Sequence, residues 1–300
     1  MTNRSTMTWS IGIPIVFAAL ALWPQAVPTA IPFVLAALGG VVTERAGIVD
    51  LALEAKLLFG AFAAAAISLL TDSTHLGVLA GIFAGIGVAT LQLVLALRFR
   101  ADQVIVGIGI NLLALGGTRF LLQLCYGEGA NSPRRDGFGD AVIANPVFWI
   151  AAIAAIVVPF AMARTRWGLR LRAAGDRPDA LVAVGVPPAR ARAAAGLVGG
   201  ALAGAGGAQL SLQTDGFSAE MSQGRGYIAI AMVILAGWRP AWAVVACVGI
   251  AFAKMFTIEL QAANIGVPRE LAELLPYVLT LVVLVVAGKH QPPPSSLGRV

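Results

Sequence analysis

Long uninterrupted apolar runs constrain the fold of this sequence more than any other feature. Several extend over about 15–23 residues, close to the ~20 that a helix needs to cross a bilayer. A membrane-spanning barrel would instead show segments of about ten residues with alternating polarity. Charged residues make up only 12% of the chain, about half their usual share in a soluble domain. The sequence therefore predicts an all-α integral membrane protein.

We expect about ten transmembrane helices, enough to place all of residues 1–300 in a single transmembrane domain. The expected spans are 8–24, 28–43, 55–71, 76–98, 103–124, 146–163, 191–212, 225–238, 241–258 and 270–288. Small residues recur from Gly81 to Gly85 and from Gly196 to Gly207, and such residues let membrane helices approach closely. The tail from Gln291 to Val300 contains three consecutive prolines, so we expect it to be extended or disordered.

Basic residues are distributed unequally between the expected loops. With a cytoplasmic N-terminus and the ten spans above, the cytoplasmic side holds Arg4, Arg98, Arg100, Arg164, Arg166, Arg170, Arg172, Arg177, Arg190, Arg192, Arg239, Lys289 and Arg299. The opposite side holds only Arg134, Arg135, Arg225 and Arg269. This asymmetry obeys the positive-inside rule, so we expect a multi-pass protein of the bacterial inner membrane with both termini cytoplasmic. The net charge of +6 is explained in the same way, and no nucleic-acid partner is expected.

The longest expected cytoplasmic loop, residues 164–192, contains the signals of a short helix. Asp176 is placed as an N-cap, Pro178 follows just inside, and Asp179 lies in the first turn, where an acid is favourable. Gly185 is placed to end the helix, and the two prolines that follow prevent its continuation. These residues predict a helix over 177–184 that either docks onto a partner or lies at the membrane surface.

A second charged segment, from Glu44 to Ala55, separates two apolar runs. It holds three carboxylates (Glu44, Asp50 and Glu54) beside Arg45. Charges at membrane depth are costly and usually are paired or line a water-filled path, and Gly47 permits a break in the helical backbone. The segment is predicted to be either a re-entrant stretch beside a transport pathway or an ordinary cytoplasmic loop.

Polar residues within the spans are candidates for contact with a transported solute. Asn111 and Arg119 lie eight residues apart and share one helix face; Gln92, with Gln123 and Gln209, extends the set. We expect a substrate pathway of Asn111, Asp50, Glu54, Arg119 and Gln92. Hydrogen bonding between helices is the alternative role for each.

Other kinds of site find little support in the sequence. The two cysteines stand far apart without a CxxC pattern, and the two histidines lie in loops, so neither a metal site nor a catalytic constellation is expected. No G-x-x-x-x-G-K-[ST] stretch is present, so this chain lacks that means of binding ATP. An ion-gradient-driven secondary transporter is the alternative class, which would be expected to show inverted repeats and broken helices.

Several stretches resemble the permeases of ATP-driven ABC importers, in the nucleoside and simple-sugar branch that is similar to branched-chain amino acid and ribose permeases. The stretch Glu44–Glu54 resembles the family's ERAG-x-x-N-x-G-x-EG motif. The stretches 107–114, 168–185, 224–231 and 274–280, together with Leu297-Gly298, agree with the same branch. The resemblance covers about residues 30–300 in unchanged order.

The resemblance implies a type II-like importer permease bundle and no catalytic role for this chain. It implies that the loop helix seats in a cytoplasmic ABC ATPase, through residues Gly175, Asp176, Arg177, Pro178, Asp179, Ala180 and Gly185. It further implies a second permease subunit, an extracytoplasmic substrate-binding protein, and no cofactor on this chain, with ATP-Mg on the ATPase. Asp50, Ala52 and Lys56 depart from the family pattern, so a simple sugar or riboflavin stands beside nucleosides as a possible substrate.

Overall fold

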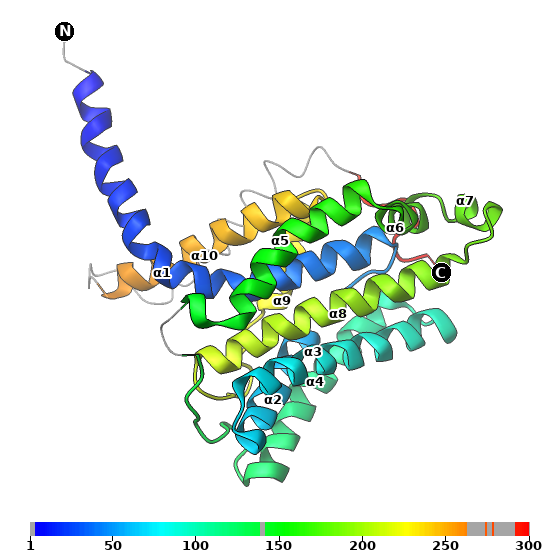
Figure 1. The fold of residues 1–300 in the computed structure, drawn as a ribbon, viewed down its shortest axis with the longest axis horizontal. Helices are drawn as coiled ribbons and strands as arrows, with labels where there is room; N and C mark the ends of the chain where they lie inside the picture. Colours follow the sequence, from blue (N-terminus) through cyan, green and yellow to red (C-terminus); the bar gives the residue numbers. More distant parts are fainter. Residues whose placement is uncertain (1–3, 139–141, 263–273, 275–277, 279–291, 300) are drawn as a thin grey trace.

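The computed structural model describes residues 4–138, 142–262, 274, 278 and 292–299, and these ranges are predominantly helical (Figure 1). The longer helices are α1 (Arg4–Arg45), α2 (Leu53–Thr71), α3 (Thr74–Leu93), α4 (Gln103–Tyr126), α5 (Pro146–Arg164), α8 (Pro188–Gln213) and α10 (Pro240–Ala262). The shorter ones are η1 (Val94–Arg98), η2 (Val142–Ala144), α6 (Arg166–Asp176), α7 (Pro178–Ala183) and α9 (Arg225–Leu235). The predicted all-α class is confirmed.

Seven described segments are long and apolar enough to cross a membrane. They are Gln25–Arg45, Leu53–Thr71, Thr74–Arg98, Gln103–Tyr126, Pro146–Arg164, Pro188–Gln213 and Pro240–Glu259. The expected spans 8–24 and 28–43 both fall within α1, which is continuous in the structure and changes direction along its length in Figure 1. The expected span 225–238 corresponds to the 11-residue α9, and 270–288 lies outside the described residues except for Leu274 and Val278.

Helix α8 lies at the centre of the bundle, with α1 and α5 on one side and α2 and α3 on the other (Figure 1). Its glycines let neighbouring backbones approach closely. A Cβ atom added to Gly60 of α2 would lie 2.6 Å from the carbonyl oxygen of Gly204, and one added to Gly200 would lie 2.6 Å from that of Gly85 in α3. The predicted role of the small-residue runs in helix packing is therefore confirmed.

Large apolar side chains remain exposed along the outside of the bundle. On α3, α4 and α5 they include Phe83, Ile105, Leu112, Phe120, Ile156 and Phe160. Exposed apolar surface of this extent marks a contact surface, and here it covers helices long enough to cross a bilayer. It is the surface expected to face lipid.

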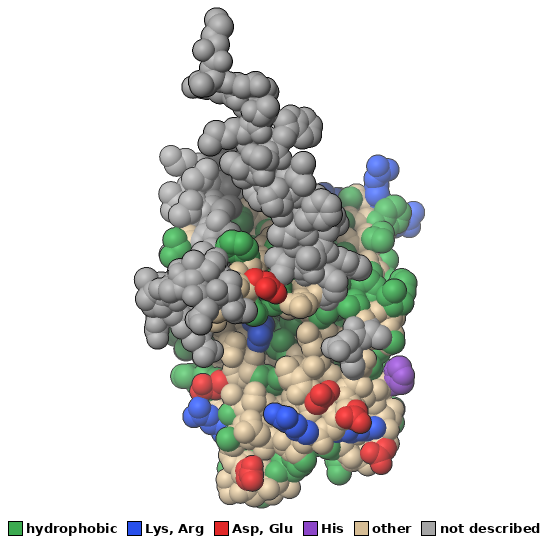
Figure 2. Space-filling view, turned by 90° about the vertical axis from the view of Figure 1, so that its left-hand side faces the viewer, with side chains coloured by type: hydrophobic (Ala, Val, Ile, Leu, Met, Phe, Trp, Pro, Cys, Tyr) green, Lys and Arg blue, Asp and Glu red, His purple; other side chains and the backbone are tan. Residues whose placement is uncertain are grey.

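The two ends of the bundle differ in charge. Exposed arginines gather at the end formed by α6, α7 and the start of α8, and they include Arg164, Arg166, Arg170, Arg177 and Arg190. Figure 2 looks onto the opposite end and shows acidic and basic side chains mixed there. The exposed charged residues of the loops at that end include Asp72, Glu128, Arg134, Asp136 and Glu220.

Candidate functional site

The chain leaves helical geometry between α1 and α2, inside the bundle. After Arg45 the backbone turns at Gly47, whose φ of 96° lies in the region that favours glycine. Most of the residues from 46 to 52 are buried, and Gly107 of α4 lets the segment approach, because a Cβ there would lie 2.7 Å from the Cβ of Leu51. We call residues 46–52 the break segment; it is largely buried against its neighbours, and its re-entrant position beside a transport pathway stays a prediction.

Side chains from α3 and α4 satisfy the backbone of the break segment. Gln92 donates from Nε2 to the carbonyl of Val49 at 3.0 Å, and Gln103 accepts from the Val49 N–H at 2.7 Å through Oε1. Asn111 donates from Nδ2 to the Leu51 carbonyl at 2.8 Å. These three amides take the place of the helical hydrogen bonds that the break removes.

Asn111 also reaches the helices on either side of it. Its Oδ1 accepts from the Ala55 N–H at 3.0 Å, and its Nδ2 donates to the Tyr227 hydroxyl oxygen at 2.9 Å. Asn111 is buried and makes three hydrogen bonds, so in this conformation it joins the start of α2 to α9 across the break segment.

Two carboxylates, Asp50 in the break segment and Glu54 at the start of α2, are buried and accept hydrogen bonds. Asp50 pairs with Lys56, with Nζ and Oδ1 at 2.5 Å and both side chains fully buried; its second oxygen, Oδ2, has no hydrogen-bond partner. Glu54 accepts from the Gly224 N–H at 2.8 Å and from the Gly226 N–H at 2.7 Å. A Cβ on Gly226 would collide with the backbone of Glu54, so that glycine permits the contact.

Glu44 and Arg45 attach the end of α1 to the turn after α9. Glu44 accepts from the Trp238 indole N–H at 2.6 Å. Arg45 donates from Nε to the Trp238 carbonyl at 2.9 Å. The charged groups on both sides of the break segment are therefore bound to protein.

The structure thus brings four of the five predicted pathway residues together: Asn111, Asp50, Glu54 and Gln92. It does not bring Arg119 to them, since Arg119 is half exposed and pairs with Glu220 at 2.7 Å near the end of α4. The four grouped residues bond to protein groups in the state described, and their contact with a solute stays a prediction.

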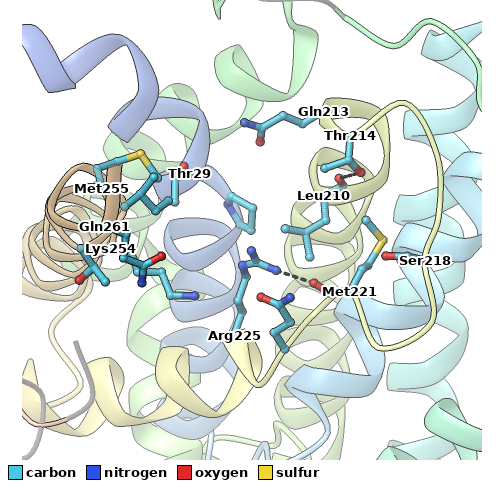
Figure 3. A pocket seen from close by; sticks show the side chains of 14 residues that line it. Thr29, Leu210, Gln213, Thr214, Ser218, Met221, Arg225, Lys254, Met255 and Gln261 are labelled. Atoms are coloured by element: carbon cyan, nitrogen blue, oxygen red, sulfur yellow. Dashed lines mark hydrogen bonds between the residues drawn. The ribbon is translucent and has the colours of Figure 1, made fainter. Parts of the chain in front are cut away.

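A cavity of about 710 Å³ lies beside the start of α9. Residues of α1, α8, α9, α10 and the loop before α9 line it: Thr29, Pro32, Leu210, Gln213, Thr214, Ser218, Met221, Gln223, Arg225, Lys254, Met255, Thr257, Ile258 and Gln261. In Figure 3, Lys254 reaches from α10 toward Arg225, and Gln213 lies at the end of α8. None of these described lining residues is acidic.

The start of α2, directly after the break segment, is bound to the part of α9 that lines the cavity. Arg225 lines the cavity and stands in the chain between Gly224 and Gly226, the two residues whose N–H groups Glu54 binds. Arg225 also donates from Nη1 to the Met221 carbonyl at 2.5 Å, and the Lys254 ammonium lies 5.5 Å from the centre of the Phe33 ring. Glu54 therefore connects the start of α2 to the backbone on either side of Arg225.

Sequence reasoning missed the residues that line this cavity. Lys254 and Glu259 lie five residues apart near the end of an apolar span, which predicts a structural pair or a lysine that extends toward the membrane surface. Gln213 and Gln223 fall in the region between two expected spans. Only the convergence of α8, α9 and α10 brings these side chains together, although a lysine inside a span was itself a signal.

The predicted loop helix is present, with one correction. Helix α7 covers Pro178–Ala183, and Gly185 follows with φ of 75°, as expected for a terminating glycine. Asp176 is not its N-cap: that position is Arg177, with no side-chain cap. Asp176 instead is the last residue of α6, which occupies the first half of the loop, so the acid belongs to the preceding helix.

The other predicted coupling residues lie at the same end of the bundle. Arg177, Asp179 and Ala180 are exposed and Pro178 is half-buried. Gly175 is buried against α1, where a Cβ would collide with the Arg45 carbonyl. Most of α7 is therefore exposed, whereas Gly175 joins α6 to the end of α1.

The tail was expected to be extended or disordered. Residues 292–294 form neither helix nor strand, and residues 295–298 form a turn. The Ser296 N–H donates to the Gly175 carbonyl at 2.8 Å, where α6 meets Gly47. A proline run indicates the absence of helix and strand, but it does not reveal binding partners.

Comparison with known proteins gives one family. The family described as the branched-chain amino acid transport system permease component matches residues 25–284. The guanosine ABC transporter permease protein NupQ of Bacillus subtilis is 30% identical over 286 residues, covering 87% of this chain and 90% of its own. The nucleoside ABC transporter permease protein NupC of Lactococcus lactis is 30% identical, covering 84% and 87%.

A further relative has a different named solute. The putative glucose ABC transporter permease protein TsgC13 of Haloferax volcanii is 32% identical over 242 residues, covering 74% of this chain and 72% of its own. No solved structure matches the chain.

Proposed function

Because the chain belongs to the family of branched-chain amino acid transport system permease components, we propose that it is the transmembrane permease subunit of an ATP-driven importer of nucleosides. The observation that carries the substrate class is the alignment with two permeases named for guanosine and nucleosides, each over more than four-fifths of both chains. The relative named for glucose keeps a simple sugar as the alternative substrate, and riboflavin is a third.

The chemistry of the cavity supports a polar, uncharged or anionic solute. Gln213, Gln223 and Gln261 offer both donors and acceptors, which match the hydroxyls of a ribose and the edges of a base. Arg225 and Lys254 add donors suited to carbonyl and hydroxyl oxygens. A cavity of about 710 Å³ is within the range that holds a small organic molecule.

Energy enters through a separate ABC ATPase in this proposal, with ATP-Mg bound there and no cofactor on this chain. The exposed α7, flanked by arginines at one end of the bundle, is the surface that supports docking of that subunit. Binding and hydrolysis of ATP would then shift the bundle between two states, and the solute crosses because each state exposes it to a different side.

We assign the arginine-rich end to the cytoplasm by the positive-inside rule, which puts the C-terminal segment 292–299 on that side, since it is bound to Gly175. The start of the continuous α1 is drawn toward the opposite end in Figure 1, so a cytoplasmic N-terminus would require a different course of residues 4–24. The mixed-charge end (Figure 2) then faces an extracytoplasmic binding protein that delivers the solute. A second permease subunit, most simply a paralogue, completes the complex.

Two measurements test the proposal. The tagged chain is purified from its native membrane in mild detergent, and the proteins that remain bound are identified. The complex is then placed in proteoliposomes for uptake of radiolabelled guanosine with and without ATP-Mg, in competition with glucose and riboflavin. ATP-dependent uptake that only nucleosides inhibit supports the proposal; competition by glucose alone transfers the substrate class to sugars.

A chain that purifies alone and folded, and transports with an ion gradient instead of ATP, would contradict the importer assignment and support a secondary transporter.

A further inference from the structure

The segment from Pro292 to Arg299, which we call the strap, is bound to two parts of the molecule that the proposed transport cycle must link. One is the end of α6, directly before α7; the other is Gly47, at the start of the break segment. The motif Leu297-Gly298 lies within it, and the proposed function assigns it no role.

The first attachment satisfies the carbonyls at the end of α6. A helix leaves its last four carbonyls without helical partners. The Ser296 N–H donates to the Gly175 carbonyl at 2.8 Å, and its hydroxyl donates to the carbonyls of Gly175 at 2.5 Å and Ala174 at 3.1 Å. The Ser295 hydroxyl donates to the Asp176 carbonyl. The strap therefore caps α6 where the chain passes into α7.

The second attachment is to the break segment. The Gly298 N–H donates to the Gly47 carbonyl at 3.0 Å. A Cβ on Gly298 would lie 3.4 Å from a methyl carbon of Val49, and Leu297 packs against the buried core. Gly298 has φ of 78°, a conformation that glycine adopts without strain.

Arg192, at the start of α8, spans the same two parts. It donates from Nε to the Ala46 carbonyl at 3.2 Å and from Nη2 to the Ala174 carbonyl at 3.4 Å. Gly175 also packs directly on the carbonyl of Arg45. The end of α6, the start of the break segment and the strap thus form one junction, buried at Arg192 and Ser296.

From this junction we infer that the strap is a positioning element that makes the break segment follow the movement of α6 and α7. The inference rests on the proposed function, because it assigns that movement to the ATPase. Displacement of α7 would pass through α6 and the strap to Gly47 and Val49, and from there through Glu54 to the cavity wall at Arg225.

The test measures coupling in the purified complex in proteoliposomes, as nucleoside uptake per ATP hydrolysed. Ser296→Ala removes the two hydroxyl bonds, and deletion of residues 292–300 removes the strap. We expect uptake per ATP to fall about two- to tenfold in Ser296→Ala, the range for hydrogen bonds worth ~0.5–1.5 kcal/mol, and further in the deletion. ATP hydrolysis should persist in both, and Ser296→Thr should restore the ratio.

Arg299→Ala is the matched control, because its backbone bond to Ser296 survives the substitution. A deletion variant with the wild-type ratio would overturn the inference. So would failure of both variants to assemble with the ATPase, since the strap would then serve folding or assembly alone. Absence of ATP-dependent uptake in the wild-type complex would instead count against the proposed function.

Discussion

Replacement of Asn111 by leucine tests whether the break segment depends on side chains of distant helices. Leucine keeps a branched side chain but has no polar atoms. The Ala55 N–H, the Leu51 carbonyl and the Tyr227 hydroxyl would each lose a partner found at 2.8–3.0 Å. Asn111 is buried, so water has poor access to replace these bonds.

The magnitude follows from the number of bonds. Hydrogen bonds between membrane helices are worth ~0.6 kcal/mol on average and up to ~1.7. Three of them give a loss of about 2–5 kcal/mol in the free energy of unfolding. Tyr227→Phe removes one partner only, and we expect a loss of about 0.6–1.7 kcal/mol.

The two cysteines provide the assay. Cys247 is buried and Cys125 is exposed, so in a Cys125→Ser background the labelling of Cys247 by a thiol reagent reports unfolding. The free energy of unfolding is measured from the labelled fraction in mixed micelles of increasing SDS content. A loss below about 0.5 kcal/mol in Asn111→Leu, or one no larger than in Tyr227→Phe, would refute the reasoning, because either means that the three bonds carry no stability.

Three further outcomes are expected. Gly60→Ala should lower the yield of folded protein on size-exclusion chromatography, because its Cβ would lie 2.6 Å from a carbonyl oxygen of α8, whereas Gly109→Ala, with no atom within 4 Å, should be tolerated; equal yields would contradict close packing along α8. Asp176→Lys combined with Ala180→Arg should leave membrane insertion intact and abolish uptake, since Asp176 is exposed at the end of α6 and Ala180 is exposed on α7; normal uptake would remove this loop from coupling. Gln213→Ala should raise the KM for uptake about two- to tenfold, the effect of one lost hydrogen bond; an unchanged KM would exclude Gln213 from substrate binding.

The helices were predictable where strong local signals coincide. The expected span 146–163 is α5, Pro146–Arg164, because Asn145 caps its first turn, accepting from the Val147 N–H, and Pro146 begins it. The span 103–124 is α4, which starts after Asp102, whose carboxylate accepts two N–H groups of the first turn. The start of a helix can therefore be predicted where an apolar run follows a residue that caps its first turn.

The N-cap assigned to Asp176 shows where local signals fail. Asp before Arg-Pro-Asp has the composition of a helix start, but the residues before it already form α6. That helix has a polar composition and a buried face formed by Gly168, Leu171 and Ala174, so contact with α1, α5 and α8 decides its conformation.

Part of the candidate site was also predictable from the sequence. Charges and amides at membrane depth pointed to Asp50, Glu54, Gln92 and Asn111, which the structure groups. Apart from the Lys56 ammonium and the Tyr227 hydroxyl, their partners are backbone groups, up to 172 residues away, and no sequence pattern encodes such pairs. The cavity depends likewise on the meeting of α1, α8, α9 and α10.

The partners of the first turn of α2 lie far along the chain, which has a consequence for insertion into the membrane. The Ala55 N–H binds Asn111, which is 56 residues later in the chain. Glu54 binds Gly224 and Gly226, which are 170 and 172 residues later. While the chain is being synthesised, these polar groups have no native partner, and hydrocarbon supplies none. We therefore expect the start of α2 to remain near water or within the insertion machinery until α9 emerges, so that this early part of the chain is among the last to reach its final depth in the membrane.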